Sequence, residues 1–404
     1  MSLNNTPSAE RLHIGFFGMR NAGKSSLVNA VTGQNLSIVS EIKGTTTDPV
    51  KKAMELLPLG PVVIIDTPGL DDEGYLGSLR IQKTEQILNQ INIGVLVTDS
   101  SVGLSEQDKN LIKTFEEKKI PYVIAYNKAD LINERPFKSD KAIYVSAKTN
   151  ENINELNEKI ANVLNSQKQE EKQIVSDLLK KGDIVVMVIP IDESAPKGRL
   201  ILPQQQTMRD ILDAHCTFIT CQPQELKETI NSLNQKPALV ITDSQAFEAV
   251  SKDTPQDVKL TSFSILFARY KGNLNILVNG AATLSKLKNG SKVLISEGCT
   301  HHRQCNDIGT VKMPAWIERF SGVKPQYSFT SGGEFPDNLK EYDLIIHCGG
   351  CMLNAQSMKS RMEKAAKSGV PIVNYGIAIA HMHGILKRSL EIFPDTLEIL
   401  KKQV

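Results

Sequence analysis

The chain has 404 residues, a length that is too great for one ordinary core and indicates two or three domains. Hydrophobic residues make up 40% and charged residues 23%, as in a typical globular protein, and no apolar run approaches the roughly 18 residues that span a bilayer. The formal net charge of +2 gives no electrostatic reason to expect nucleic acid or a membrane as a partner. The polar N-terminus lacks a signal pattern, so we expect a cytoplasmic protein whose six cysteines are buried or bind metal.

The first motif is a phosphate-binding loop. Residues 18–25 read GMRNAGKS and match G-x-x-x-x-G-K-[ST], between an apolar strand pattern at 12–17 and an apolar helix pattern at 26–31. Glycines let backbone N–H groups surround an anion, and the helix dipole favours negative charge at the same place. Lys24 is expected to reach the terminal phosphates and Ser25 to bind Mg²⁺. The expected nucleotide contacts of this motif are Asn21, Ala22, Gly23, Lys24, Ser25 and Ser26.

Two further motifs are expected near the γ-phosphate. A polar segment carries Thr45 and Thr46, and a mobile loop with threonines can close on the γ-phosphate and give a hydroxyl to Mg²⁺. The apolar residues 62–65 predict a buried strand that leads into Asp66 and Gly69. We expect Asp66 to hold Mg²⁺ through water and the Gly69 amide to face the γ-phosphate.

The remaining motifs of this region are suited to reading a guanine base. The Asp130 carboxylate can accept hydrogen bonds from N1–H and the 2-amino group of guanine, which adenine cannot offer. Asn127 is expected to reach the base edge and Lys128 to lie along the ring face. Ser146 and Ala147 follow a predicted strand and can touch the guanine oxygen through their backbone. The order of the motifs predicts a GTP-binding domain.

With these motifs in place, residues 12–165 resemble a small GTPase domain of the Era/TrmE type. As in that group, the residue after D-x-x-G is not the glutamine that orients water in other GTPases; here it is Leu70. The resemblance implies slow hydrolysis with Lys24, Thr46 and Gly69 as catalytic residues and Thr46 as the Mg²⁺ ligand of the threonine loop. It also implies that Asn21 helps to hold a K⁺ ion, which stimulates hydrolysis in place of an arginine finger.

A polar stretch at residues 166–173 predicts a domain boundary, and a second series of strands and helices follows it. The alternation predicts a parallel sheet. Cys216 and Cys221 are expected on one strand, facing opposite sides, as buried and inert thiols. No phosphate loop or acid–base pair occurs here, so the segment is interpreted as an interaction or dimerisation surface.

Cysteines and histidines follow two later predicted strands. Residues 292–296 lead into Cys299, and residues 342–346 lead into Cys348 and Cys351. Carboxyl ends of parallel strands build ligand crevices, so the three thiols can converge if the strands are neighbours. Cys351 is expected to open a helix over residues 352–367, whose dipole favours the thiolate. Three thiolates with nearby histidines suit either a 4Fe–4S cluster or a Cys₃His zinc site.

The GTPase motifs, the polar link, the middle segment and C-x-H…H-C-x-x-C together resemble the HydF-type maturation GTPase of FeFe hydrogenases. The resemblance implies a 4Fe–4S cluster on Cys299, Cys348 and Cys351, with an exchangeable fourth ligand that the sequence leaves open among His301, His347 and Glu297. It further implies a homodimer that acts as a scaffold. The scaffold would receive a di-iron unit with CO and cyanide ligands from radical-SAM partners and pass it to apo FeFe hydrogenase. The gap between His301 and His347 is at the short edge of the family spacing.

We therefore expect an α/β protein with a P-loop GTPase domain followed by two further α/β domains with mainly parallel sheets. The alternative is a zinc-containing Era-type GTPase that acts in RNA modification or ribosome assembly, against which stand the near-neutral charge and the lack of a basic, aromatic-bearing patch. The expected parts are a GTPase domain, a linker, a middle domain and a cluster-binding domain at residues 1–168, 169–180, 181–268 and 269–404.

Overall fold

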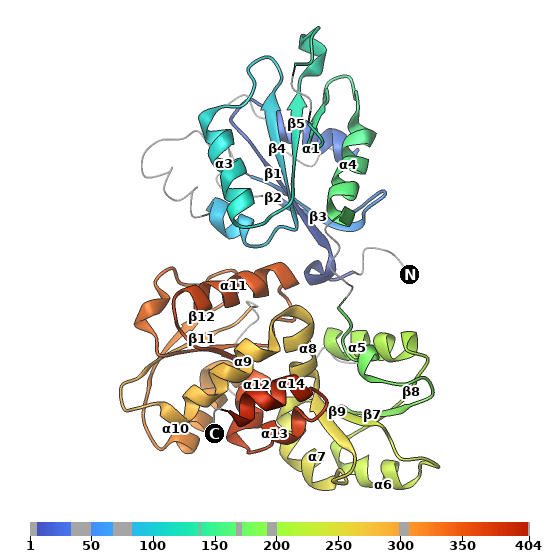
Figure 1. Cartoon of the computed structure of the whole chain (residues 1–404), viewed down its shortest axis with the longest axis vertical. Coiled ribbons are helices and arrows are strands. Elements are labelled where there is room, and N and C mark those ends of the chain that lie inside the picture. Colours follow the sequence, from blue (N-terminus) through green and yellow to red (C-terminus); the bar gives the residue numbers. More distant parts are fainter. Residues whose placement is uncertain are drawn as a thin grey trace. The chain divides into compact units, whose positions relative to one another are not determined.

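The computed structural model divides the chain into two compact units, residues 1–171 and residues 172–404 (Figure 1). None of the helices in the described part of the chain is long and apolar enough to cross a bilayer. The structure describes residues 6–33, 50–67, 83–136, 139–166, 172–191, 200–298 and 307–402.

The first unit is built on a six-stranded sheet of order β2-β3-β1-β4-β5-β6. Only the pairing of β2 with β3 is antiparallel. The central strands are continuous apolar runs, as expected for parallel strands that are covered on both faces. In chain order the strands are β1 (Leu12–Phe17), β2 (Val50–Leu56), β3 (Gly60–Asp66), β4 (Ile93–Asp99), β5 (Tyr122–Asn127) and β6 (Ala142–Tyr144).

Helices cover both faces of this sheet. The helices α1 (Lys24–Thr32) and α4 (Ile153–Ser166) share one apolar core with it, and α3 (Glu106–Glu117) contributes to the other (Figure 1). Helix α3 begins where Ser105 and Asp108 form a reciprocal capping box. Short 3₁₀ turns lie at η2 (Ser8–Glu10) and η3 (Ala129–Leu131). This three-layer α/β arrangement confirms the predicted P-loop fold.

The second unit contains two four-stranded sheets in which every pairing is parallel. This confirms the prediction of further α/β structure with parallel sheets. One sheet has the order β10-β9-β7-β8 and the other has the order β12-β11-β13-β14. The strands are β7 (Ile184–Val188), β8 (Thr217–Cys221), β9 (Leu239–Thr242), β10 (Lys259–Ser262), β11 (Lys292–Ser296), β12 (Gln326–Thr330), β13 (Leu344–His347) and β14 (Ile372–Asn374).

Helices or short turns separate these strands along the chain, as the crossover connections of parallel sheets require. The helices are α5 (Leu202–Asp213), α6 (Leu226–Asn231), α7 (Phe247–Asp253), α8 (Phe263–Lys271), α9 (Leu274–Ala281), α10 (Met313–Ser321), α11 (Ala355–Lys367), α12 (Tyr375–Met382), α13 (Leu386–Ser389) and α14 (Pro394–Lys401). Shorter turns are η4 (Ser176–Leu178), η5 (Pro223–Glu225), η6 (Ser244–Ala246), η7 (Ala282–Lys286), η8 (Ile308–Lys312) and η9 (Leu339–Glu341).

One hydrophobic core runs through the second unit, from Ile174 to Leu400, and includes strands of both sheets. Close contacts also join elements of this unit that follow strands of different sheets. Asn374 Nδ2 donates to the Ser264 carbonyl at 3.1 Å, and a Cβ atom on Gly376 would lie only 2.2 Å from Ser264 Cβ. The Arg388 guanidinium donates to the carbonyls of three residues at the end of α7 and just beyond it, Ser251, Thr254 and Pro255.

Two of the expected domain boundaries fall inside packed structure. Residues 172–180, assigned above to a linker, include Ile174 and Val175, which are buried in the second unit. The backbone N–H of Val175 donates to Asp210 Oδ2 at 2.7 Å. Residue 268, the expected end of the middle domain, lies within α8. The division of the second unit into two domains stays a prediction.

Candidate functional site

The phosphate-binding loop joins β1 to α1, and its backbone requires glycine at two positions. Gly18 has φ +143°, and a Cβ there would lie 2.0 Å from the Val97 carbonyl oxygen. Gly23 has φ +87°, and a Cβ there would lie 2.3 Å from Asn127 Nδ2. The buried Lys24 ammonium donates to the carbonyls of Gly18 and Met19 at 2.7 and 2.9 Å, which holds it inside the loop. Ser26 follows in the first turn of α1.

A divalent cation fits beside this loop. Ser25 Oγ donates to Asp66 Oδ2 at 2.8 Å, which joins the start of α1 to the end of β3. The second oxygen, Asp66 Oδ1, is buried and makes no hydrogen bond to any group in the described part of the chain. A hydroxyl and a buried carboxylate are the oxygen ligands that Mg²⁺ prefers. The two residues predicted for this role therefore lie in contact.

The base-reading motifs lie against the same loop. Asn127 Nδ2 donates to the Ala22 carbonyl at 3.0 Å, and Asn127 Oδ1 accepts from the Ala147 N–H at 3.1 Å. Asp130 Oδ1 accepts from Ser146 Oγ at 2.6 Å, which fixes the orientation of an otherwise exposed carboxylate. The side chain of Asn127 thus ties the phosphate loop to the segment that carries Ser146 and Ala147.

Lys128 has a partner that sequence reasoning missed. Its ammonium forms an ion pair with Asp99 Oδ2 at 2.6 Å, and its carbonyl accepts from Ser100 Oγ at 3.0 Å. Burial pushes the pKa of Asp99 upward, but hydrogen bonds from Lys128 and Ser101 outweigh burial and leave the pKa below its ordinary value. The signal was present in the sequence, because Asp99 ends a buried strand on the same sheet edge as the predicted motifs.

Several predicted nucleotide contacts lie outside the described residues: Thr45, Thr46 and Gly69. The proposed K⁺ ligand Asn21 is described; it is exposed in the loop, with φ 61°. Its role, and the catalytic roles of Thr46 and Gly69, stay predictions.

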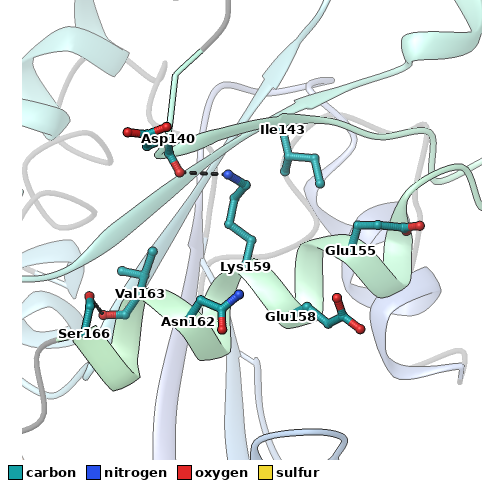
Figure 2. A pocket seen from close by; sticks show the side chains of 8 residues that line it. All are labelled: Asp140, Ile143, Glu155, Glu158, Lys159, Asn162, Val163 and Ser166. Carbon is teal, nitrogen blue, oxygen red and sulfur yellow. Dashed lines mark hydrogen bonds between the residues drawn. The ribbon is translucent and has the colours of Figure 1, made fainter.

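A hollow of the first unit lies away from these motifs. It has a volume of about 410 Å³ and lies between β6 and α4, with Ile143, Glu155 and Glu158 among its lining residues (Figure 2). Lys159 reaches across it and donates to the Asp140 carbonyl at 2.7 Å. Because Asp140 precedes β6 whereas Ser146 follows it, this hollow lies at the opposite end of the strand from the nucleotide motifs.

The cysteine motif of the second unit lies at the carboxyl ends of two adjacent strands. Strands β11 and β13 pair in parallel, with Ser296 opposite His347. The condition stated above for convergence of the two cysteine segments, that these strands are neighbours, is therefore met. Gly298 donates its N–H to Cys348 Sγ at 3.0 Å, and Gly350 donates to the same sulfur at 3.4 Å. The predicted ligands Cys299 and His301 lie outside the described residues.

The described part of this site fits a thiolate-bound metal group. Burial raises the pKa of Cys348 to about 11, whereas the two N–H donors oppose the rise because they stabilise the thiolate. Such N–H donors to sulfur also tune metal–sulfur clusters. Within the described ranges no three His, Cys, Asp or Glu side chains are close enough to hold a metal ion. Two of the three predicted thiols, Cys348 and Cys351, are placed, and both are free cysteines.

The predicted relation of Cys351 to a helix start is wrong. Helix α11 begins at Ala355, and its N-cap is Asn354, whose side chain accepts from the Ser357 N–H at 2.9 Å. Cys351 lies in the preceding turn. Asn354 starts the helix because its side chain satisfies a free N–H of the first turn, so Cys351 does not lie at the start of the helix.

His347, a candidate fourth ligand, has both ring nitrogens engaged. Nε2 lies 2.8 Å from Arg361 Nη1, and Nδ1 lies 2.7 Å from the Cys348 carbonyl oxygen. Because a guanidinium can only donate, Nε2 accepts and Nδ1 carries the proton. Burial, followed by the charge of Arg361, lowers the pKa of His347 to about 3. The ring is therefore neutral.

Glu297, the other described candidate, is buried next to the cysteine loop. Its Oε1 atom accepts from the Tyr375 hydroxyl at 3.2 Å. A Cβ on Gly309 would lie 2.5 Å from Glu297 Oε1, so the carboxylate fits only because that residue is glycine. Burial raises the pKa of Tyr375, so the hydroxyl remains a proton donor at neutral pH.

The two cysteines of the middle segment, Cys216 and Cys221, lie near β8 and not on the strands that carry this motif. Cys216 is buried and its Sγ atom contacts the Lys180 carbonyl at 3.1 Å, but it lies just before β8 rather than on the strand. Cys221 ends β8, is half-buried, and has a pKa that burial raises.

Three family models match successive segments of the chain. Residues 13–128 match the model of the 50S ribosome-binding GTPase family, so the first unit is a GTPase domain and its cofactors are GTP and Mg²⁺. Residues 174–272 match the hydrogen maturase F dimerization domain, and residues 275–392 match the hydrogen maturase F tetramerization domain. The chain is therefore a member of the hydrogen maturase F (HydF) family, in which a GTPase domain precedes two domains named for oligomerization.

Curated relatives match mainly the GTPase unit. GTPase Der of Kosmotoga olearia is 33% identical over 131 residues, which cover 31% of this chain and 29% of that protein. The tRNA modification GTPase MnmE of Chromobacterium violaceum is 31% identical over 160 residues, which cover 38% and 35%. The chain thus spans about a third of the length of these two relatives. A solved structure of Era from Aquifex aeolicus bound to GDP and AlF₄⁻ is 16% identical, covers 80% of this chain and 94% of its own, and has a TM-score of 0.33, too low to support a functional conclusion.

Proposed function

We propose that this protein is a GTP-hydrolysing scaffold that binds a 4Fe–4S cluster on Cys299, Cys348 and Cys351. The observation that carries the proposal is the N–H···S contact of 3.0 Å between Gly298 and Cys348. Gly298 directly precedes Cys299 in the sequence, so this contact joins the two cysteine segments. When bound, the cluster supplies an iron that cysteine does not ligate. The chain supplies the thiolates and the N–H donors that stabilise them.

The cargo of the scaffold is a di-iron unit with CO and cyanide ligands. Radical-SAM proteins supply this unit, and apo FeFe hydrogenase receives it. Membership of the hydrogen maturase F family supports this assignment. Delivery takes place in the cytoplasm, and no step requires nucleic acid or a membrane.

The fourth cluster ligand is His301, His347 or Glu297. His347 could bind iron through Nε2 only after Arg361 releases that atom. Glu297 could bind iron through Oε2 while Oε1 keeps its hydrogen bond from the Tyr375 hydroxyl. His301 lies outside the described residues, so all three candidates stay open and each is tested by substitution.

The GTPase unit acts as a switch that changes partner affinity or release rather than as a source of energy for cluster chemistry. Thr46 and Gly69 sense the γ-phosphate, and Lys24 stabilises charge on the phosphates. A K⁺ ion on Asn21 stimulates slow hydrolysis. The protein acts as a homodimer through residues 174–272, and the name of that family domain supports this arrangement.

The test is anaerobic reconstitution of the full chain with iron and sulfide. We expect a brown protein with about four irons per chain and, after reduction, the EPR signal of a 4Fe–4S cluster. Cys348→Ser should lose most of the iron, whereas Cys216→Ser, the matched control at a buried thiol elsewhere, should keep it. A colourless protein that holds one zinc per chain would overturn the proposal in favour of a zinc-containing Era-type GTPase.

A further inference from the structure

A buried lysine holds the turn that carries the second cysteine pair. Lys271 is the last residue of α8, and its side chain is only 6% exposed. Its ammonium donates to the Leu353 carbonyl at 3.1 Å and to those of Gly350 and Cys351, both at 3.4 Å. All three acceptors belong to one short turn. The three hydrogen bonds from this lysine therefore hold the turn in place.

The turn has little freedom to move away from the lysine. Gly350 has φ +63°, and a Cβ there would lie 2.6 Å from Met358 Sδ on α11. Leu353 packs against Gly298, where a Cβ would lie 2.8 Å from Leu353 Cγ. Leu353, whose carbonyl accepts from Lys271, thus packs its side chain against the residue that precedes Cys299. The buried Lys271 ammonium therefore lies beside the backbone that carries the cysteine motif.

A buried ammonium attracts a group of negative charge that binds nearby, because charges are screened less inside a protein than in water. Three thiolates and a [4Fe–4S]²⁺ core carry a net charge of about −1, and one-electron reduction makes it about −2. A fixed positive charge stabilises the reduced form more than the oxidised form, so it raises the reduction potential of the cluster.

We propose that Lys271 is a positioning residue for the cluster, which orients the Gly350–Leu353 turn and raises the cluster's reduction potential through its charge. This inference rests on the proposed function, because it requires a cluster on Cys348 and Cys351. Lys271 belongs to the segment matched by the dimerization domain, whereas the turn belongs to the segment matched by the tetramerization domain. The lysine therefore also couples the position of α8 to the metal site.

The experiment compares full-length Lys271→Met and Lys271→Arg with the wild type and with Lys340→Met, a control that removes an exposed ammonium from the same unit. Each protein is reconstituted anaerobically with iron and sulfide, its iron is counted, and its midpoint potential is measured by EPR during titration with dithionite, the one-electron reductant. Circular dichroism of the proteins before reconstitution checks folding. Iron content tests the proposed function, and the potential tests this inference.

We expect Lys271→Met to shift the midpoint potential to more negative values, and Lys271→Arg and Lys340→Met to stay near the wild type. Loss of the cluster from a folded Lys271→Met protein, with retention by Lys271→Arg, would equally support the positioning role. An unchanged potential and full iron content in Lys271→Met would overturn it. If Lys271→Met does not fold, a wild-type potential in Lys271→Gln decides against the inference and a lowered one decides for it. If the wild type itself binds no iron, the proposed function fails first.

Discussion

Arg361 Nη1 lies 2.8 Å from the Nε2 atom of His347, and both side chains are buried. The same nitrogen lies 3.2 Å from Ser296 Oγ, and Arg361 Nη2 donates to the Gly332 carbonyl at 2.7 Å. Burial lowers the pKa of Arg361 to about 10, so the guanidinium is still charged at neutral pH. One arginine thus ties together the ends of β11 and β13, from which both cysteine segments leave.

Replacement of this arginine should destabilise the second unit. In Arg361→Met the Nε2 atom of His347 loses its donor while it stays buried, and we expect the free energy of unfolding to fall by about 2 to 4 kcal/mol. The chain has a single tryptophan, Trp316, which packs against the core of this unit. Urea unfolding followed by its fluorescence therefore measures this unit. Arg319→Met, at an exposed position on α10, is the control and should change the stability by less than about 0.5 kcal/mol.

A pH effect on the first unit is expected from His13. Burial, followed by the charge of Lys51, lowers the pKa of His13 from 6.5 to about 4. The unfolded chain takes up a proton near pH 6.5 and the folded chain does not, so stability falls as the pH drops from 6.5 to 4 and is unaffected above that window. The full loss is about 3 kcal/mol. Hydrogen exchange of the β1 amides, corrected for intrinsic rates, measures this loss of stability as a function of pH.

His13→Gln should flatten this pH dependence because glutamine does not titrate. His215→Gln, at a position in the second unit, is the control and should leave the β1 profile as in the wild type. A His13→Gln profile that still falls by the wild-type amount would show that another group is responsible.

Replacement of the phosphate-loop lysine should weaken nucleotide binding and leave iron binding unchanged. In Lys24→Ala we expect affinity for a GTP analogue, measured by calorimetry, to fall at least about tenfold, since a charge-assisted contact to phosphate is lost. Iron uptake should be unchanged, because the cysteine motif belongs to the other unit. Lys109→Ala, at an exposed position on α3, is the control for nucleotide binding. A parallel loss of iron would contradict the independence of the two sites.

The Asp130 carboxylate should determine the preference of the nucleotide site for guanine over xanthine. In Asp130→Asn we expect weaker GTP binding and a gain for xanthosine triphosphate, whose ring offers an acceptor where guanine offers the 2-amino donor. Competition against a fluorescent GTP analogue measures both affinities. The contact to Ser146 can persist, since the asparagine oxygen can still accept from that hydroxyl. Unchanged preference for GTP would remove Asp130 from base recognition.

The sequence was sufficient for those features whose determinants are local. The phosphate loop and the strands that precede each motif follow from short patterns. That β11 and β13 are neighbours was only a condition for convergence of the thiols, because local patterns do not determine the order of strands in a sheet. The start of α11 was misplaced because residues 351–353 form a turn and Asn354 provides the cap. That competition between a turn and a helix depends on one side-chain hydrogen bond, which composition does not reveal.

The supporting cations could not have been predicted. Lys271 contacts a carbonyl 82 residues away, and Arg361 contacts a histidine 14 residues away on another element. Each looks like an ordinary surface residue of an amphipathic helix in the sequence, and only the packing of α8 and α11 buries it. The ion pair between Asp99 and Lys128 is different, because Asp99 ends β4 and Lys128 follows β5 at the sheet edge that carries the predicted motifs, and the rule for parallel sheets could have indicated it.

The shared core of the second unit has a practical consequence for experiments on isolated pieces. The segments matched by the dimerization and tetramerization domains meet between residues 272 and 275, yet Ile174 and Leu400 belong to one apolar cluster and Arg388 closes over the end of α7. A polypeptide that stops at residue 272 would expose the apolar surface of α8 and leave three carbonyls without their guanidinium. Such halves should aggregate when expressed apart and regain a native fold only when both are present in the same refolding mixture.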